Sequence, residues 1–114
     1  MRHEESHIQT AVVSWVRYQY PNFLLTGGFA GETMTIQRAT RRKRMGYLAG
    51  TADLFILEPK GLYHGLFIEM KAPKGVQSDS QKSFGERATT NGYCYVVCHS
   101  LAEAHQAVEK YLLG

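Results

Sequence analysis

The chain has 114 residues, of which 44% are hydrophobic and 20% are charged, and its formal net charge at pH 7 is +3. We expect residues 1–114 to form a single domain, because this length supports one compact core and leaves no room for a second catalytic domain. No apolar run approaches the roughly 20 residues needed to cross a bilayer, and the polar start from Met1 to Glu5 does not fit a signal peptide. These observations exclude an integral membrane protein and predict a soluble, cytoplasmic one.

The first half of the chain predicts two helices around a short strand. Apolar residues at helical spacing predict an amphipathic helix over residues about 4–19, closed by Pro21. Residues 23–26 predict a short strand, and the glycine-rich stretch 27–31 that follows lacks the spacing and the lysine of a phosphate-binding P-loop. Residues about 33–45 predict a second helix, with Gly46 as its C-cap.

A cluster of basic residues lies within the second predicted helix. Its members are Arg38, Arg41, Arg42, Lys43 and Arg44. Such a cluster suits a polyanion such as DNA, although an ordinary solvated helix face explains it equally well. Together with Lys74, these residues are our candidates for contacts with DNA.

After Gly50 the spacing of the apolar residues changes from a helical pattern to continuous runs. Residues 53–58 and 66–71 are apolar runs separated by a loop, which predicts a hairpin of two central strands. Side chains alternate along a strand, so Glu69 and Lys71 share one face of the second run.

The last part of the chain carries strong helix signals. Ser78 and Gln81 fit a capping box for a helix over about 79–90, which ends near Gly92. Residues 93–97 predict a strand, and a second capping box from Ser100 to Glu103 opens a final helix with an apolar stripe. The order of elements predicts a small mixed α/β layer fold. Cys94 and Cys98 are too few for a disulfide framework and lack a second pair for zinc, so we assign them no function.

Asp53 and Glu69 are the most informative residues, because each is an acid in an otherwise apolar strand. A buried carboxylate is costly without a partner, so a buried ion pair between Glu69 and Lys71 or an arginine would account for the pattern. The alternative is a metal site at which both carboxylates and the Lys71 ammonium converge. Mg²⁺ prefers hard oxygen ligands, and the main-chain carbonyl of Met70 could supply a third. The ion would acidify a bound water, and Lys71 would hold or help to deprotonate the attacking water.

Several ordered segments of the chain resemble one nuclease family. They are Glu5-x-x-Ile8-Gln9, Gly50-Thr51-Ala52-Asp53-Leu54, Gly65-Leu66-Phe67-Ile68-Glu69-Met70-Lys71, Ser78-x-x-Gln81 and Gly92-Tyr93. Over almost the whole chain they resemble the VRR-NUC nucleases of the PD-(D/E)xK superfamily. The family usually has proline before the first catalytic aspartate, where this chain has Ala52, but proline there supplies no reacting group.

The resemblance implies a restriction-endonuclease-like core, a small mixed β-sheet flanked by helices, and divalent-metal-dependent cleavage of DNA. Asp53, Glu69 and Lys71 match the family's catalytic positions. Glu5 matches its helix-one acid, which contacts the metal directly or through water, although the helix dipole alone favours an acid there. Gln81 matches a motif glutamine near the active site, although its capping box explains it equally well. The implied cofactor is Mg²⁺, with Mn²⁺ able to substitute, and no small-molecule cofactor is implied.

Stand-alone members of this size, found in bacteria and their viruses, resemble homodimeric Holliday-junction resolvases, whereas longer relatives are repair enzymes. Our main hypothesis is therefore a homodimeric endonuclease for branched DNA, acting in a bacterial cell or a phage-infected bacterium. Two alternatives stay open. The first is a non-catalytic DNA-binding module with a nuclease-like fold, and the second is a nuclease for flaps, nicked duplex or sequence-specific sites.

Overall fold

The computed structural model describes residues 3–28 and 35–114, and its centre is a four-stranded mixed sheet. The strands are β1 (Leu25–Gly27), β2 (Leu54–Ile56), β3 (Leu66–Met70) and β4 (Cys94–Cys98), in the spatial order β1-β2-β3-β4. β1 and β2 pair antiparallel, as do β2 and β3, whereas β3 and β4 pair parallel. The predicted hairpin of two central strands is therefore confirmed.

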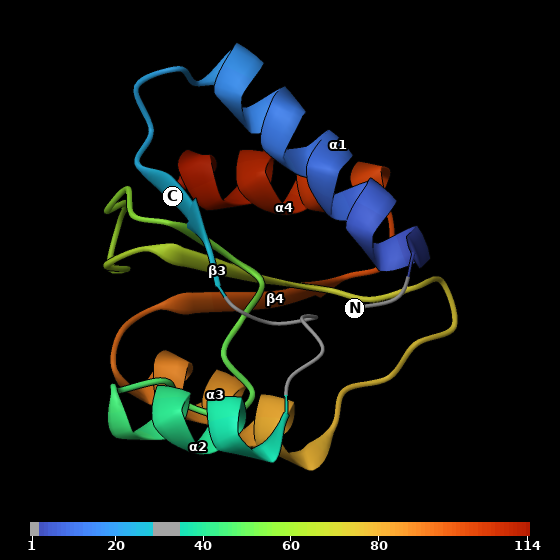
Figure 1. The fold of residues 1–114 in the computed structure, drawn as a ribbon. Helices are drawn as coiled ribbons and strands as arrows, with labels where there is room; N and C mark the ends of the chain where they lie inside the picture. The colour runs from blue at the N-terminus through green and yellow to red at the C-terminus, as the bar shows by residue number, and fades with distance from the viewer. Residues whose placement is uncertain (1–2, 29–34) are drawn as a thin grey trace.

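Helices cover both faces of this sheet (Figure 1). The helices α1 (His3–Gln19) and α4 (Leu101–Leu113) lie over one face, and α2 (Ile36–Arg44) and α3 (Asp79–Thr90) lie over the other. α3 is the crossover that joins β3 to its parallel neighbour β4, as a parallel pair requires. The α/β fold expected from the sequence is confirmed.

Side-chain alternation along β3 divides the interior into two cores. Ile68 and Met70 face α1 and α4, where they join Val12 and Val108 in the larger core. Phe67 faces the other way and packs with Phe55, Phe84, Tyr93 and Tyr95 in a smaller, aromatic core. Glu69 lies on the Phe67 side, as predicted, and is thereby directed toward α3.

Most predicted elements are confirmed, with shifts at their ends. The helix expected over about 79–90 is α3 itself, opened by a complete capping box between Ser78 and Gln81. The first strand begins later than expected, because the amide of Phe23 still bonds to Tyr20 in the turn that closes α1. β4 begins one residue late because the amide of Tyr93 bonds to Ala88 at the end of α3.

The N-terminal ends of α2 and α4 differ from the sequence-based expectation. α2 begins at Ile36, with Thr35 as its N-cap, and the expected start at residue 33 lies outside the described residues, as do residues 29–31 of the glycine-rich stretch. The second capping box is only half formed. Ser100 caps α4, but the Glu103 carboxylate accepts from the amide of His99 at 2.9 Å instead of from that of Ser100, and it also contacts the His99 ring at 3.4 Å.

Both cysteines are free thiols without a sign of reactivity. Burial raises the pKa of Cys98 to about 11 and also raises the pKa of Cys94, so both thiols are protonated at neutral pH. Among the described helices, none is long and apolar enough to cross a membrane.

Gly50, which lies just before β2, packs closely against the backbone at the start of α3. Its replacement tests that contact. Its φ is +81°, and an added Cβ would lie 2.2 Å from the carbonyl oxygen of Ser80. We expect Gly50→Ala to lower the free energy of unfolding by about 3 kcal/mol, from left-handed strain and from overlap with backbone. Gly46 is the matched control, because its φ is +107° and nothing lies within 4 Å of an added Cβ.

For Gly46→Ala only the backbone strain remains, about 1 kcal/mol. Urea unfolding of both variants measures the difference. Equal losses would show that Gly50 does not hold β2 and α3 together.

Candidate active site

Strand pairing brings the two predicted acids together. Asp53 immediately precedes β2, and the pairing of Leu54 with Ile68 places Asp53 beside Glu69. Both residues are buried, with exposed fractions of 2% for Asp53 and 1% for Glu69. Lys71 follows β3 directly, and its ammonium lies 3.8 Å from Glu69 Oε2. The structure thus places Asp53, Glu69 and Lys71 in one group.

Each carboxylate is held by a specific donor. Asp53 Oδ2 accepts from the amide of Met70 at 2.8 Å, which ties the β2 end to β3. Glu69 Oε2 accepts from Gln81 Nε2 at 2.8 Å. The other oxygen of Glu69, Oε1, is buried and has no hydrogen-bond partner. An unpartnered carboxylate oxygen in a buried strand is unfavourable, so this atom is suited to bind a positive group or a donor.

An ion pair alone does not account for the group. One ammonium faces two buried carboxyl groups, and the charge of Glu5 acts on both. Burial, followed by the charge of Asp53, raises the pKa of Glu69 to about 9. Burial also raises the pKa of Asp53, although its bond from Met70 opposes the rise. Fully ionised, the group would carry more negative charge than Lys71 can balance, so the raised pKa keeps Glu69 protonated at neutral pH in the metal-free protein.

A hard divalent cation fits this pair of acids, because its charge would replace the proton on Glu69. Two facing carboxyl groups, one with a free oxygen, are ligands that Mg²⁺ accepts, and it commonly takes the rest of its shell from water and phosphate. Within residues 3–28 and 35–114, no group of three or more His, Cys, Asp or Glu side chains could hold a metal ion. A cation here would thus rest on Asp53 and Glu69, without a third such side chain. No histidine in the described part of the chain completes such a group.

Gln81 connects the start of α3 to the site. Its Oε1 accepts from the amide of Ser78 at 2.8 Å within the capping box, while its Nε2 donates to Glu69. One side chain therefore serves both as the cap of the helix and as a contact of the site.

Glu5 lies at the margin of the group. Its Oε1 accepts from the amide of Ala72 at 3.3 Å, so it ties α1 to the chain just beyond Lys71. Its charge raises the pKa of both Asp53 and Glu69, although the helix does not bring it into a three-residue ligand set.

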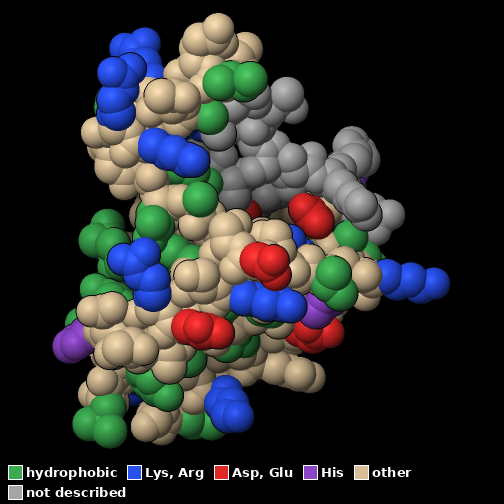
Figure 2. Space-filling view, turned by 90° about the horizontal axis from the view of Figure 1, so that it is seen from below, with side chains coloured by type: hydrophobic (Ala, Val, Ile, Leu, Met, Phe, Trp, Pro, Cys, Tyr) green, Lys and Arg blue, Asp and Glu red, His purple; other side chains and the backbone are tan. Residues whose placement is uncertain are grey.

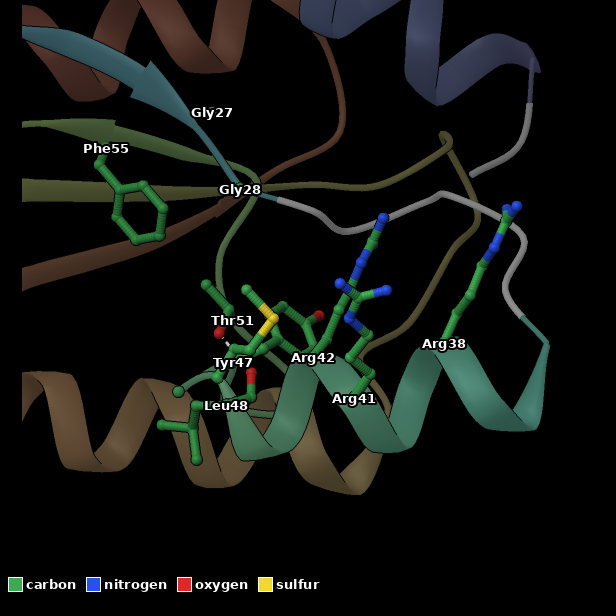
Figure 3. Close-up of a pocket in the computed structure, with 11 residues that line it drawn as sticks. Gly27, Gly28, Arg38, Arg41, Arg42, Tyr47, Leu48, Thr51 and Phe55 are labelled. Atoms are coloured by element: carbon green, nitrogen blue, oxygen red, sulfur yellow. Dashed lines mark hydrogen bonds between the residues drawn. The ribbon is translucent and has the colours of Figure 1, made fainter.

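The predicted basic cluster is divided by the geometry of α2. Arg38, Arg41 and Arg42 line a groove of about 690 Å³, whereas Lys43 and Arg44 are outside its lining. Figure 3 shows the three arginine side chains rising from α2 toward the sheet. Lys74 is exposed in the turn after β3. On the face formed by α2 and α3, basic side chains are interspersed with acidic ones, so this face is not uniformly positive (Figure 2).

Sequence reasoning missed the other side of this groove. Tyr47, Thr51 and Phe55 line it together with the arginines. The charges of Asp53, Arg42 and Glu69 all act on the Tyr47 hydroxyl, whose pKa is raised mainly by burial. The one signal for these residues in the sequence was their position, within a few residues of Asp53.

The raised pKa of Glu69 predicts how the metal-free protein responds to pH. The folded value of about 9 exceeds the ordinary 4.5, so between these values the folded state binds more protons than the unfolded state. Stability is then greatest below the unfolded pKa and falls as pH rises through the folded one. We expect the melting temperature measured in EDTA to fall from pH 5.5 to pH 8.5, and to fall much less for Glu69→Gln. A similar slope for both proteins would contradict the raised pKa.

Comparison with known proteins agrees with this geometry. No curated protein matches the chain at a significant level. A solved structure titled "VRR_NUC domain protein" is 28% identical and superposes with a TM-score of 0.78, over 96% of this chain and 88% of its own. Another, titled "VRR_NUC domain", is 19% identical and shares the fold, with a TM-score of 0.63 over 96% of this chain and 99% of its own. The VRR-NUC domain profile matches residues 3–102. The chain therefore belongs to the VRR-NUC family, a family of nucleases.

Proposed function

We propose that this protein is a divalent-metal-dependent endonuclease that hydrolyses phosphodiester bonds in DNA and prefers branched DNA such as Holliday junctions. The observation that carries the proposal is the buried pair of Asp53 and Glu69 beside Lys71, with Glu69 Oε1 unpartnered, in a chain of a nuclease family. A buried acid pair with one ammonium has little value for stability. It suits a site at which a bound cation replaces the proton that the raised pKa keeps on Glu69 in the metal-free protein.

Asp53, Glu69 and the main-chain carbonyl of Met70 would hold Mg²⁺, and Mn²⁺ would substitute for it. When bound, the ion lowers the pKa of a water and neutralises charge on the scissile phosphate. Glu5 is proposed to act through water, because its side chain does not form a three-residue ligand set with the two acids.

Lys71 is proposed to act on the attacking water. Its side chain is 13% exposed and its ammonium lies 3.8 Å from Glu69 Oε2, so it reaches the same space as the carboxylates from the end of β3. There it would orient the water, help to deprotonate it and stabilise the charge of the transition state. Gln81 is proposed to hold the Glu69 carboxylate in one orientation through its 2.8 Å bond.

Gln81→Glu separates the catalytic role of Gln81 from its capping role. Glutamate at this position preserves the capping box, but it places a second carboxylate against Glu69 Oε2. We expect Gln81→Glu to retain the wild-type melting temperature within a few degrees. Its cleavage rate should fall by about tenfold or more, because repulsion between the two carboxylates would displace Glu69 from its orientation in the site. Gln81→Ala should lose activity and also about 1 kcal/mol of stability.

Full activity of Gln81→Glu, measured by cleavage rate beside thermal unfolding, would reduce Gln81 to a helix cap.

DNA contact is proposed for the basic residues of α2 and for the turn after β3. These residues are Arg38, Arg41, Arg42, Lys43, Arg44 and Lys74. Contacts of this kind hold the phosphate backbone and do not read base sequence, so we propose a structure-selective enzyme.

A homodimer is proposed because symmetric resolution of a four-way junction takes two cuts, and one chain offers one such acid pair. We propose that it acts in a bacterial cell or a phage-infected bacterium, as the smallest members of its family do. The experiment is light scattering of the purified protein together with mapping of its cuts on a labelled four-way junction. Paired, symmetric nicks from a dimer are expected. A monomer that cuts one strand of a flap would overturn the junction proposal and leave a flap nuclease.

The main rival is a non-catalytic DNA-binding module. It predicts salt-sensitive DNA binding through α2 that is unaffected by loss of the acids, apart from relief of charge repulsion. The buried acid pair argues against it, because a module that only binds phosphates is weakened by carboxylates near them.

A further inference from the structure

The groove beside α2 has two chemically different kinds of lining. The guanidinium groups of Arg38, Arg41 and Arg42 enter it from α2, and Gly27 and Gly28 pass along the opposite side as bare backbone. Aromatic and apolar side chains complete it. They are Tyr47, Phe55, Met45 and Leu48, of which Met45 is 76% exposed. A site for a phosphate alone has no use for this second kind of lining.

The aromatic side chains come from opposite walls of the groove. In Figure 3, Phe55 extends from the sheet and Tyr47 lies at the end of α2 beside the arginines. Phe55 is fixed by its edge-on contact with Phe67, whose ring centroid is 4.8 Å away. Tyr47 is held by its amide, which donates to the carbonyl of Arg42 at 2.8 Å. The ring of Phe55 and the backbone of Tyr47, on the two sides of the groove, are therefore both held in place by neighbouring residues.

The residues that line the groove lie next to the acid pair, although Asp53 and Glu69 are not part of its lining. Thr51, on its wall, is two residues from Asp53, and its hydroxyl bonds to the Leu48 carbonyl. The amide of Gly28 donates to the carbonyl of Asp53 at 3.0 Å. The charges of Asp53 and Glu69 on one side and of Arg42 on the other reach the Tyr47 hydroxyl. A strand held at the carboxylates would thus place its neighbouring nucleotide in the groove.

The nature of that nucleotide follows from the lining. In a DNA duplex the faces of the bases are covered by stacking, so a protein can reach only the phosphates and the edges of the bases in the DNA's own major and minor grooves. A ring that lies in an arginine-lined groove can stack on a base only if that base is unpaired. The groove's volume of about 690 Å³ lies within the range of sites that take small ligands.

We propose that this groove binds an unpaired nucleotide next to the scissile phosphate, with Arg38, Arg41 and Arg42 on its phosphate and Tyr47 against its base. The inference rests on the proposed function, because it takes the strand to be DNA held at the acid pair. It assigns the preference for branched DNA to Tyr47, since a flap holds an unpaired nucleotide at its branch point and a paired four-way junction would have to open a base pair there.

The test measures binding without cleavage. Two DNA probes, in buffer with EDTA, carry the fluorescent base 2-aminopurine either unpaired at a branch point or paired within a duplex arm. Wild type and Tyr47→Phe are expected to quench the unpaired probe on binding. Tyr47→Ala and Tyr47→Leu are expected to lose the quenching and to bind the branched probe about tenfold more weakly, the usual effect of losing one base stack, while duplex binding is unchanged.

Arg44→Ala is the matched control, because Arg44 is on α2 but outside the groove lining. It should weaken binding to both probes by the same factor, as a phosphate contact does. Melting temperatures of all variants identify any that fail to fold, and Tyr47→Leu keeps the apolar bulk if Tyr47→Ala does not fold.

Absence of quenching by wild type, or equal weakening of both probes by Tyr47→Leu, would overturn the proposal. Cleavage assays with Mg²⁺ keep the two hypotheses apart. Cleavage without a selective effect of Tyr47 refutes the groove alone, whereas selective groove binding by a protein that never cuts refutes the nuclease function alone.

Discussion

Glu69→Gln is expected to abolish cleavage, with a fall of at least about 10³-fold in the single-turnover rate, because half of the charge that would hold the cation is removed. The change is small in shape. A glutamine oxygen can still accept from Gln81 Nε2, which lies 2.8 Å from Glu69 Oε2. Burial and Asp53 raise the pKa of Glu69 to about 9, so the metal-free fold already favours a neutral group there. The variant should therefore fold at least as well as wild type.

The measurement is cleavage of end-labelled DNA at saturating Mg²⁺, beside thermal unfolding in EDTA. Glu109→Gln is the control, since Glu109 is exposed on α4 on the opposite face of the sheet. It should cut at the wild-type rate. A folded Glu69→Gln protein with wild-type activity would remove Glu69 from the site.

Lys71→Met is expected to lower the turnover rate by about 10³-fold while metal binding is retained, because the lost group acts on the water and the transition state. Its ammonium lies 3.8 Å from Glu69 Oε2 and is the positive partner of an acid-rich group. Removing that charge also removes its repulsion of a bound cation, so the affinity for Mn²⁺ should be equal or higher.

Calorimetric titration with Mn²⁺, together with single-turnover rates, distinguishes this outcome from a general loss of structure. Lys110→Met provides the comparison, because Lys110 is an exposed lysine of α4. If Lys71→Met lost Mn²⁺ binding and activity together, Lys71 would be a support for the carboxylates and not a group that acts on the water.

The sequence predicted those parts of the fold that local chemistry determines. The capping box of Ser78 and Gln81 and the left-handed Gly92 defined α3, and the change of period after Gly50 located β2 and β3. The acid pair was predictable because a carboxylate in an apolar strand is costly, and strand alternation then placed Glu69 and Lys71 on one face. Their association in the structure needed only the register of one hairpin.

Other parts depend on contacts between distant segments. The rotation of α2 decides that Arg38, Arg41 and Arg42 enter the groove while Lys43 and Arg44 do not, and a helix that buries no residue has no apolar stripe to reveal its orientation. Tyr47 lies between two elements, in a segment without periodicity, so nothing local marked it as part of the site. The bond between Gln81 and Glu69 likewise required α3 to be placed on the sheet.

The most direct test of the central claim is the dependence of DNA cleavage on the divalent ion. Protein freed of metal with EDTA is given a labelled four-way junction and increasing Mg²⁺, and the nicks are followed over time. We expect no cleavage without the ion, a saturable rise as it is added, and 5′-phosphate ends on the products. Cleavage that continues at the same rate after the ion is removed, or no cleavage at any concentration of the ion, would contradict the assignment of Asp53 and Glu69 as a metal-binding nuclease site.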